Sequence, residues 1–384
     1  MGNIFYGLAG EGRGHATRAR AVVEALRPRH RVTLFTSDCA LDLLGPLYDG
    51  TDVRVVSIPG LHFTYNRSGQ VDLLGTVAGA ARFRLKVDGY AQAMLPEFER
   101  GRPDLVIADF EPILPRACRL LGVPFISFDH QHYLVVSDLS ALPFGLRQQA
   151  ALSAPFVRAL YDWQQGTIVS SFYRPPLKAA HRDAIQVGVL LRPDVVRQRP
   201  EHGRHLLAYM RRVARPSVMQ ALAACGRQVF VYGLGERPAE GALRFLPIDE
   251  RRFLEHMAGC DAVISTAGNQ LVGEALYLRK PLLVLPEERN FEQSVNAHFL
   301  EQSGGGWAEW GALTSARLGA FLEATPALRA CIVPGSVCGN FEAVAAIERF
   351  IAQVNGAFTR RKTRPAAPPR RPARQAAVSR TQWA

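Results

Sequence analysis

The chain alternates short apolar runs with segments of helical length. In the first half the runs are continuous and rich in β-branched or aromatic residues, which is typical of parallel strands covered by helices on both faces. We expect these strands at Ile4–Ala9, Val32–Thr36, Val53–Ile58, Leu105–Ala108, Phe125–Phe128, Ile168–Phe172 and Ile185–Leu191. A pattern of this kind predicts a doubly wound α/β domain.

The same rhythm begins again after a polar break at residues 192–204. We expect strands at His205–Met210, Gln228–Leu234, Leu243–Ile248, Ala262–Thr266 and Leu282–Pro286, and helices near 216–224, 249–258, 269–279 and 291–303. The predicted fold is α/β, with two Rossmann-like doubly wound domains at residues 1–191 and 205–339 joined by a linker at 192–204. Because ligands bind at the carboxyl ends of strands in such sheets, we expect the site in a cleft between the domains.

The end of the chain differs from the rest in composition. Residues 340–356 predict a C-terminal helix, and residues 357–384 predict a disordered tail rich in Pro, Arg and Ala. From residue 360 onward the tail carries eight cations and no acid, so that only four of the twelve excess positive charges belong to the body. This argues against a nucleic-acid partner. The tail is either an anchor on an anionic membrane surface or a passive charged extension.

The apolar runs and the cysteines indicate where in the cell we expect the protein. No run reaches the ~18 residues of a membrane span, and the first residues lack the pattern of a signal peptide. We therefore expect a cytoplasmic protein, which would be peripheral on the inner face of the plasma membrane if the tail is an anchor. The six cysteines show no metal-ligand spacing, which predicts reduced thiols and no metal site.

A glycine-rich segment follows the first strand and opens a helix that we expect at Ala16–Leu26. Gly12 and Gly14 allow a tight turn, and the free N–H groups of a helix start can bind an anion. The dinucleotide-binding pattern G-x-G-x-x-G fails, because His15 occupies the third glycine position. His15 is therefore a candidate general base, with a structural capping role as the alternative.

A second strand, turn and helix cover residues 265–276. Small residues at the turn would let the helix amides meet a diphosphate, and Glu274 could accept both hydroxyls of a ribose. The alternative makes Glu274 a surface acid that complements the helix dipole. Further along, Glu292 and Gln293 begin a helix and would face the group that the diphosphate carries, unless they form a solvated helix start.

Acidic and imidazole side chains follow the fourth and fifth predicted strands. Asp109 or Glu111 could orient His15 and stabilise its charged ring, or the two acids could bind a metal. Asp129, His130, Gln131 and His132 are expected at the acceptor site, with a buried, hydrogen-bonded histidine as the alternative.

Taken together, these motifs resemble GT-B-fold glycosyltransferases. Residues 246–306 are similar to the donor-binding domain of the MurG group, which uses UDP-sugars, in Pro247-Ile248-Asp249, Ser265-x-x-Gly268, Glu274, Lys280-Pro281 and Glu292-Gln293-x-x-Asn296-Ala297. The first half resembles predicted bacterial and archaeal glycosyltransferases in Gly-Glu-Gly-x-Gly-His-x-x-Arg (10–18), Asp-Phe-Glu-Pro (109–112) and Asp-x-Gln-His (129–132). Arg279, Lys280 and Asn269 depart from the pattern, because relatives often have smaller residues or glycine there.

The resemblance implies an inverting transferase that moves a sugar from a nucleotide-diphosphate sugar, expected to be a UDP-sugar, to an acceptor hydroxyl on a lipid-linked or cell-envelope acceptor. The donor-binding residues would be Gly12, Gly14, Ile248, Thr266, Gly268, Asn269, Gln270, Glu274, Glu292 and Gln293. His15 would be the base, with Asp109 and Glu111 as its catalytic acids, and helix-terminus amides would stabilise the leaving diphosphate without a metal cofactor. The alternatives are a nucleotide-sugar epimerase on the same fold and a catalytically silent sugar-nucleotide-binding protein.

Overall fold

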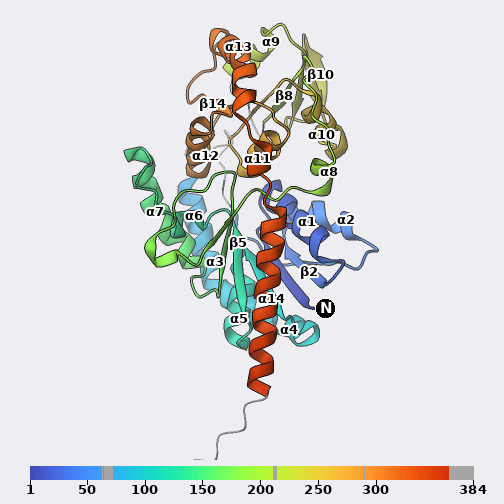
Figure 1. Ribbon diagram of the computed structural model, residues 1–384, viewed down its shortest axis with the longest axis vertical. Coiled ribbons are helices and arrows are strands. Elements are labelled where there is room, and N and C mark those ends of the chain that lie inside the picture. Colours follow the sequence, from blue (N-terminus) through green and yellow to red (C-terminus); the bar gives the residue numbers. More distant parts are fainter. Residues whose placement is uncertain (63, 65–71, 211–213, 289, 363–384) are drawn as a thin grey trace, which may run out of the picture.

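The structure is a computed structural model that describes residues 1–62, 64, 72–210, 214–288 and 290–362. It consists of two α/β halves, and Figure 1 shows one above the other with helix α14 running along the lower half. Each half is built on a seven-stranded sheet. The predicted fold class is confirmed, because both sheets are parallel apart from one edge strand.

The first sheet has the strand order β3-β2-β1-β4-β5-β6-β7 and is parallel throughout. Its strands are β1 (Asn3–Leu8), β2 (Arg31–Thr36), β3 (Arg54–Ser57), β4 (Leu105–Asp109), β5 (Phe125–Asp129), β6 (Thr167–Ser170) and β7 (Ile185–Val187). Its helices are α1 (Arg13–Leu26), α2 (Asp38–Tyr48), α3 (Leu73–Ala93), α4 (Leu95–Gly101), α5 (Ile113–Leu121), α6 (Tyr133–Val136) and α7 (Phe144–Leu160), with a short 3-10 helix at Ala179–His181.

The second sheet has the order β10-β11-β9-β8-β12-β13-β14, with β10 antiparallel to β11. Its strands are β8 (Leu206–Tyr209), β9 (Val229–Tyr232), β10 (Arg237–Glu240), β11 (Leu243–Leu246), β12 (Ala262–Ser265), β13 (Leu282–Val284) and β14 (Gly306–Ala308). The remaining helices are α8 (Pro193–Val196), α9 (Pro216–Ala223), α10 (Glu250–Gly259), α11 (Asn269–Tyr277), α12 (Phe291–Gln302), α13 (Ser315–Cys331) and α14 (Asn340–Lys362), with a 3-10 helix at Pro334–Ser336.

Apolar side chains fill both faces of each sheet, as continuous apolar strands require. On one face of the first sheet, α1 and α2 share a core with α14, which contributes Ala343, Ala346, Ile347 and Ile351. On the other face, α3, α4 and α5 pack around Phe5 and Phe35. Helix α14 therefore leaves the second half and is buried against the first, which ties the two halves together.

Several predicted boundaries need correction. Helix α14 continues to Lys362, so residues 357–362, which we predicted to be disordered, are helical. Arg and Lys are strong helix formers, and no proline interrupts this segment. Helix α1 begins at Arg13 rather than at residue 16, and the sequence analysis did not anticipate β10, β14 or α13. The rest of the predicted tail, residues 363–384, lies outside the described residues.

In the part of the chain that the structure describes, no helix combines the length and apolar character that crossing a membrane requires.

Candidate active site

Two helix starts, one from each half, meet at the carboxyl ends of the sheets. Helix α1 follows β1, helix α11 follows β12, and the two helices are in contact. A Cβ atom added to Gly14 would lie 3.8 Å from the Cβ atom of Gln270. The first-turn N–H groups of both helices thus border the interface between the halves, where the sequence analysis expected the cleft.

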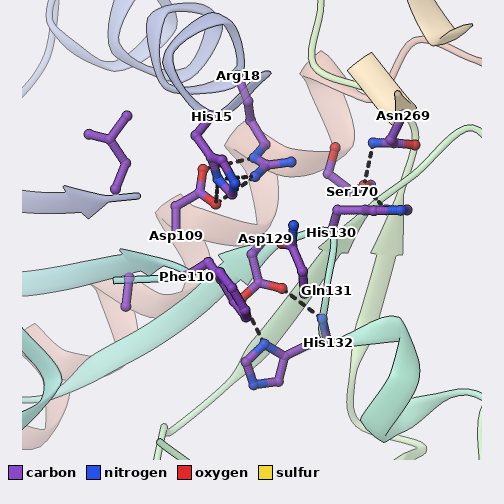
Figure 2. A network of polar contacts seen from close by, with 12 residues as sticks. His15, Arg18, Asp109, Phe110, Asp129, His130, Gln131, His132, Ser170 and Asn269 are labelled. Carbon is purple, nitrogen blue, oxygen red and sulfur yellow. Dashed lines mark hydrogen bonds and ion pairs between the residues drawn. The ribbon is translucent and has the colours of Figure 1, made fainter. Parts of the chain in front are cut away.

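His15, Arg18 and Asp109 form a buried polar cluster beside this interface (Figure 2). The Nδ1 atom of His15 lies 2.8 Å from Oδ1 of Asp109. Arg18 donates from Nη2 to Oδ1 of Asp109 at 2.5 Å and from Nε to Oδ2 at 2.9 Å. The Asp109 side chain is fully buried, whereas that of His15 is 14% exposed. The imidazole is therefore the member of the cluster that can meet a ligand.

Local geometry explains why these residues meet. Gly12 caps α1 with a φ of 79°, a left-handed conformation that favours glycine. His15 and Arg18 are three residues apart and so share a face of the helix. Strand β4 pairs with β1 in a register that places Asp109 beside Leu8. The carboxylate therefore lies next to the turn that begins α1.

The cluster holds the Asp109 carboxylate in its charged form. Burial alone would raise the pKa of Asp109, but the Arg18 guanidinium and the His15 ring together lower it below its ordinary value. The Tyr6 hydroxyl donates to Oδ2 of the same carboxylate at 3.4 Å. Phe110 stacks near the His15 ring, with 6.4 Å between centroids, and has a φ of 57°. Left-handed backbone at a bulky residue is strained, and such strain gathers at functional sites.

Glu111 does not join this cluster, which corrects the prediction that it is a catalytic acid. Its Oε1 and Oε2 atoms accept the backbone N–H groups of Ile113 and Leu114 at 2.5 and 3.0 Å, so it caps the start of α5. Burial raises the pKa of Glu111 to about 7, against the opposing effect of these two N–H groups. The two acids that flank Phe110 therefore have different functions.

The predicted acceptor residues at the end of β5 also differ from one another in their contacts. Asp129 accepts the backbone N–H of His132 at 2.8 Å and lies 2.7 Å from its Nδ1 atom. Both side chains are buried, which matches the alternative of a buried, hydrogen-bonded histidine. Gln131 instead points across the interface and donates to Oε2 of Glu292 at 3.1 Å. The structure thus brings together one predicted acceptor residue and one predicted donor residue.

Further contacts across the interface join His130, a predicted acceptor residue, to Asn296, to which we had assigned no role. Nε2 of His130 lies 3.2 Å from Oδ1 of Asn296, which also accepts the Tyr173 hydroxyl at 3.0 Å. Burial lowers the pKa of His130, so the neutral ring is favoured. Asn296 and Arg18 both belong to the sequence motifs, and the spacing of Arg18 from His15 was the available signal for its position.

The predicted donor residues of α11 form hydrogen bonds with other segments of the chain. Asn269 donates to the backbone oxygen of Ser170 at 3.2 Å, and Gln270 donates to that of Leu190 at 2.8 Å (Figure 2 shows the former). Glu274 is 2% exposed. Its two oxygens accept from Gln270 and from Nη2 of Arg192, each at 3.1 Å. A ribose could therefore reach Glu274 only if the Arg192 pair opened, and its role in ribose binding stays a prediction.

The other predicted donor residues fall into two groups. Gln293 is 3% exposed. It exchanges hydrogen bonds with the backbone and side chain of Glu287, and its assignment to the sugar stays a prediction. Ile248 is 41% exposed at the end of β11, and Thr266 and Gly268 form the turn before α11. These three residues remain where a nucleotide could meet them.

Among the residues that the structure describes, no group of three or more His, Cys, Asp or Glu side chains is arranged to hold a metal ion.

Comparison with known proteins identifies the class. Spinosyn forosaminyltransferase SpnP has 16% sequence identity and a TM-score of 0.61, with 91% of this chain and 99% of that chain covered. Arabidopsis thaliana UGT89C1, solved in complex with UDP-L-rhamnose, has 13% identity and a TM-score of 0.66, with 92% and 99% covered. The two Rossmann-like halves therefore form the GT-B fold of glycosyltransferases.

The chain belongs to glycosyl transferase family 1, whose model matches residues 2–326. An uncharacterized glycosyltransferase of Methanosarcina mazei is 22% identical over 336 residues, which cover 78% of this chain and 83% of the relative. The protein is thus a glycosyltransferase, which takes a nucleotide-sugar donor and an acceptor.

Proposed function

We propose that the protein transfers a hexose from a UDP-sugar to an acceptor hydroxyl, with inversion at the anomeric carbon. The observation that carries this proposal is the partly exposed His15 ring, backed by the buried Asp109 carboxylate, at the start of a helix that faces α11. A general base is what an acceptor hydroxyl needs in order to attack.

The chemistry requires one displacement. The acceptor oxygen forms its bond to the anomeric carbon as the bond from that carbon to the diphosphate oxygen breaks. Nε2 of His15 takes the hydroxyl proton, while the N–H at Nδ1 donates to Asp109, which stabilises the imidazolium. Attack from the face opposite to the leaving diphosphate inverts the configuration at that carbon.

The donor would bind along the start of α11. Gly268 and Thr266 form a turn without bulky side chains, and the first N–H groups of α11, with those near Gly12 and Gly14 of the facing turn, would stabilise the diphosphate. This electrostatic stabilisation makes the proposed reaction independent of a metal. Backbone at Ile248 would contact the base, and the fold neighbour bound to UDP-L-rhamnose supports uridine there. The likeness of these motifs to the MurG group is part of this proposal.

The sugar would lie near Gln131 and Glu292, the pair that spans the interface. The Oε1 atom of Gln131 is buried without a hydrogen-bond partner. A sugar or acceptor hydroxyl could donate to this oxygen, which removes the cost of leaving it unsatisfied. Asp129 and His132 would support the acceptor site from behind, because both are buried.

Donor binding would require contacts between the halves to open. Asn269, Gln270 and Glu274 all contact the first half or the linker in this arrangement. The Arg192 side chain also pairs with Glu250, which in turn pairs with Arg20 of α1. We propose that the halves move apart at these contacts to admit the nucleotide.

We also propose that the acceptor is lipid-linked or belongs to the cell envelope and that the basic tail holds the protein at an anionic membrane. This part rests on the sequence alone, since residues 363–384 lie outside the described residues. Deleting them should leave UDP binding unchanged and weaken binding to anionic vesicles, most strongly at low salt. Equal vesicle binding by both proteins would make the tail a passive extension.

The test of the transfer reaction is a donor and acceptor screen. The protein is incubated with UDP-glucose or UDP-N-acetylglucosamine and a panel of lipid-linked and soluble acceptors, and released UDP and glycosylated product are measured. The anomeric configuration of the product, read by NMR, should be the opposite of that in the donor. Retained configuration would contradict the single displacement, and an epimerised nucleotide sugar without transfer would contradict the transferase assignment.

A further inference from the structure

Arg18 is a buried arginine for which the transfer chemistry proposed above has no use. It is 3% exposed and lies one turn after His15 on α1. Its Nε and Nη2 atoms contact the two different oxygens of Asp109, at 2.9 and 2.5 Å. Two parallel N–H donors on one carboxylate make the strong, geometrically specific form of this ion pair. Arg18 therefore fixes the orientation of the Asp109 side chain.

The same guanidinium also touches the catalytic ring. Nη2 of Arg18 lies 2.9 Å from Nδ1 of His15, and both atoms approach Oδ1 of Asp109. An arginine can only donate hydrogen bonds. If the His15 proton is on Nδ1, it is donated to Oδ1 and Nε2 keeps the lone pair that a base needs. If the proton is on Nε2, Nδ1 accepts from Arg18 and Nε2 cannot act as a base.

The charge balance of the cluster follows from this geometry. With Arg18 present, the buried pair of guanidinium and carboxylate is neutral before the reaction. Without Arg18, the buried negative charge of Asp109 would be compensated by one additional proton, on the His15 ring or on the carboxylate itself. In either case His15 would be less available as a base at neutral pH.

The other groups near Asp109 are neutral or already paired. Tyr6 on β1 and Tyr161 beyond α7 are buried phenols, and burial raises the pKa of both. The charge of Asp109 adds to this effect at Tyr6, and the charges of Asp129 and Asp109 add to it at Tyr161. Asp129 ends β5 and is paired with His132, and burial lowers the pKa of His130, the next residue. Helix α11 presents the neutral amides of Asn269 and Gln270, and its Glu274 is paired with Arg192. These groups do not replace the positive charge beside Asp109.

We infer that Arg18 is a positioning residue of the His15–Asp109 pair: it fixes the carboxylate and supplies the positive charge that leaves the imidazole unprotonated and ready to accept the acceptor proton. This inference deepens the proposed function and rests on the role of His15 as the base.

The test reads the protonation of His15 directly. Protein labelled with ¹⁵N in its histidines is titrated by NMR, and the His15 signals are assigned by their loss in His15→Gln. In the wild-type protein we expect the neutral form of the ring to carry its proton on Nδ1. In Arg18→Met we expect the cluster to take up its proton at a pH higher by about one unit or more, a tenfold change. In Arg18→Lys, which keeps the charge, we expect a midpoint near that of the wild type.

Kinetics provide the second readout. The kcat of Arg18→Met should fall more than about tenfold further at pH 6 than at pH 9, with a smaller change in donor KM. Arg18→Lys should lose rate without a change in the shape of its pH profile. Arg116→Met is the matched control, because Arg116 is a buried arginine outside the His15–Asp109 cluster: it donates to the carbonyls of Pro112 and Leu160 and pairs with the exposed carboxylate of Asp88 at 3.3 Å. It should reduce thermal stability and leave the pH profile unchanged.

The outcomes separate this inference from the proposed function. An unshifted His15 titration in folded Arg18→Met overturns the role of Arg18, whatever the activity. If Arg18→Met does not fold, a wild-type His15 ring protonated on Nε2 at pH 7, or an Arg18→Lys midpoint shifted as far as predicted for Met, overturns it. A shifted titration together with full transfer by His15→Gln would support Arg18 and reject His15 as the base.

Discussion

Among the described residues of the first half, two histidine–aspartate pairs have their aspartates at the ends of the neighbouring strands β4 and β5, and these pairs differ in their surroundings. His15 and Asp109 lie 2.8 Å apart, and Asp109 also binds Arg18. Asp129 and His132 lie 2.7 Å apart, and the Tyr161 hydroxyl, 3.3 Å from Asp129, completes that group. The His15 side chain is 14% exposed at the interface, whereas that of His132 is 1% exposed.

This difference teaches that the pair alone does not define a catalytic base. His132 is held by its own turn, because Asp129 also accepts the His132 backbone N–H, and the ring stacks on Tyr161 with 5.4 Å between centroids. His15 instead begins a helix at the interface, and its aspartate comes from a separate strand. Access to a ligand and a compensating cation distinguish the first pair from the second.

The largest effect is expected for Asp109→Asn. The variant loses the charge that stabilises the His15 imidazolium and should reduce kcat by roughly 10²–10⁴-fold. Steady-state transfer measures this loss, and calorimetry with UDP should show little change in donor affinity. Because the substitution leaves Arg18 without its carboxylate, a thermal melt must accompany the kinetics. Wild-type turnover by the folded variant would contradict the assignment of Asp109.

His132→Gln should reduce stability rather than catalysis, the opposite of the effect expected for Asp109→Asn. Loss of a buried hydrogen bond to a charged group should lower the free energy of unfolding by about 1–3 kcal/mol. At a temperature where the variant is folded, kcat should stay within about tenfold of the wild type. Denaturant unfolding and transfer assays check both expectations. A kinetic defect as large as that of Asp109→Asn would place His132 in the chemistry.

Glu111 should make the stability of the protein depend on pH. Its folded-state pKa is raised from the ordinary value of 4.5 to about 7 by burial. The folded protein therefore holds this proton more tightly, so its stabilising effect is present below pH 4.5 and is lost as the pH rises toward 7. The effect is at most about 3 kcal/mol. Unfolding of Glu111→Gln should depend less on pH between 5 and 8 than that of the wild type. An equal pH dependence of unfolding in both proteins would contradict the raised pKa of Glu111.

Metal removal should have the smallest effect. If helix N–H groups stabilise the diphosphate, transfer measured after treatment with EDTA should equal that of the untreated protein. Complete loss of transfer that Mg²⁺ or Mn²⁺ restores would show that the reaction uses a metal, and it would reopen the alternative in which Asp109 is a ligand.

Much of the fold could be predicted because its strands are continuous apolar runs. All seven strands of the first sheet and five of the second were expected near their observed positions. Strand β14 is three residues long and begins with Gly306, and α13 contains Pro326, so neither shows a clear periodic pattern. The end of α14 was misjudged because its basic composition is also typical of disorder.

The candidate site was predictable in its location but not in its contacts. The motifs predicted that His15 would meet Asp109 or Glu111, since these residues follow neighbouring parallel strands. They could not show that the Glu111 side chain accepts a hydrogen bond from the first turn of α5 or that Arg192 donates to Glu274. Both outcomes depend on side-chain direction and on how the halves touch, which spacing along a sequence does not encode.

The most direct test of the account compares His15→Gln with His132→Gln in single-turnover transfer, with UDP affinity measured in parallel. The account predicts that His15→Gln loses transfer by roughly 10²–10⁴-fold while binding UDP normally, and that folded His132→Gln transfers at nearly the wild-type rate. Wild-type transfer by His15→Gln would contradict the central claim that this histidine is the base.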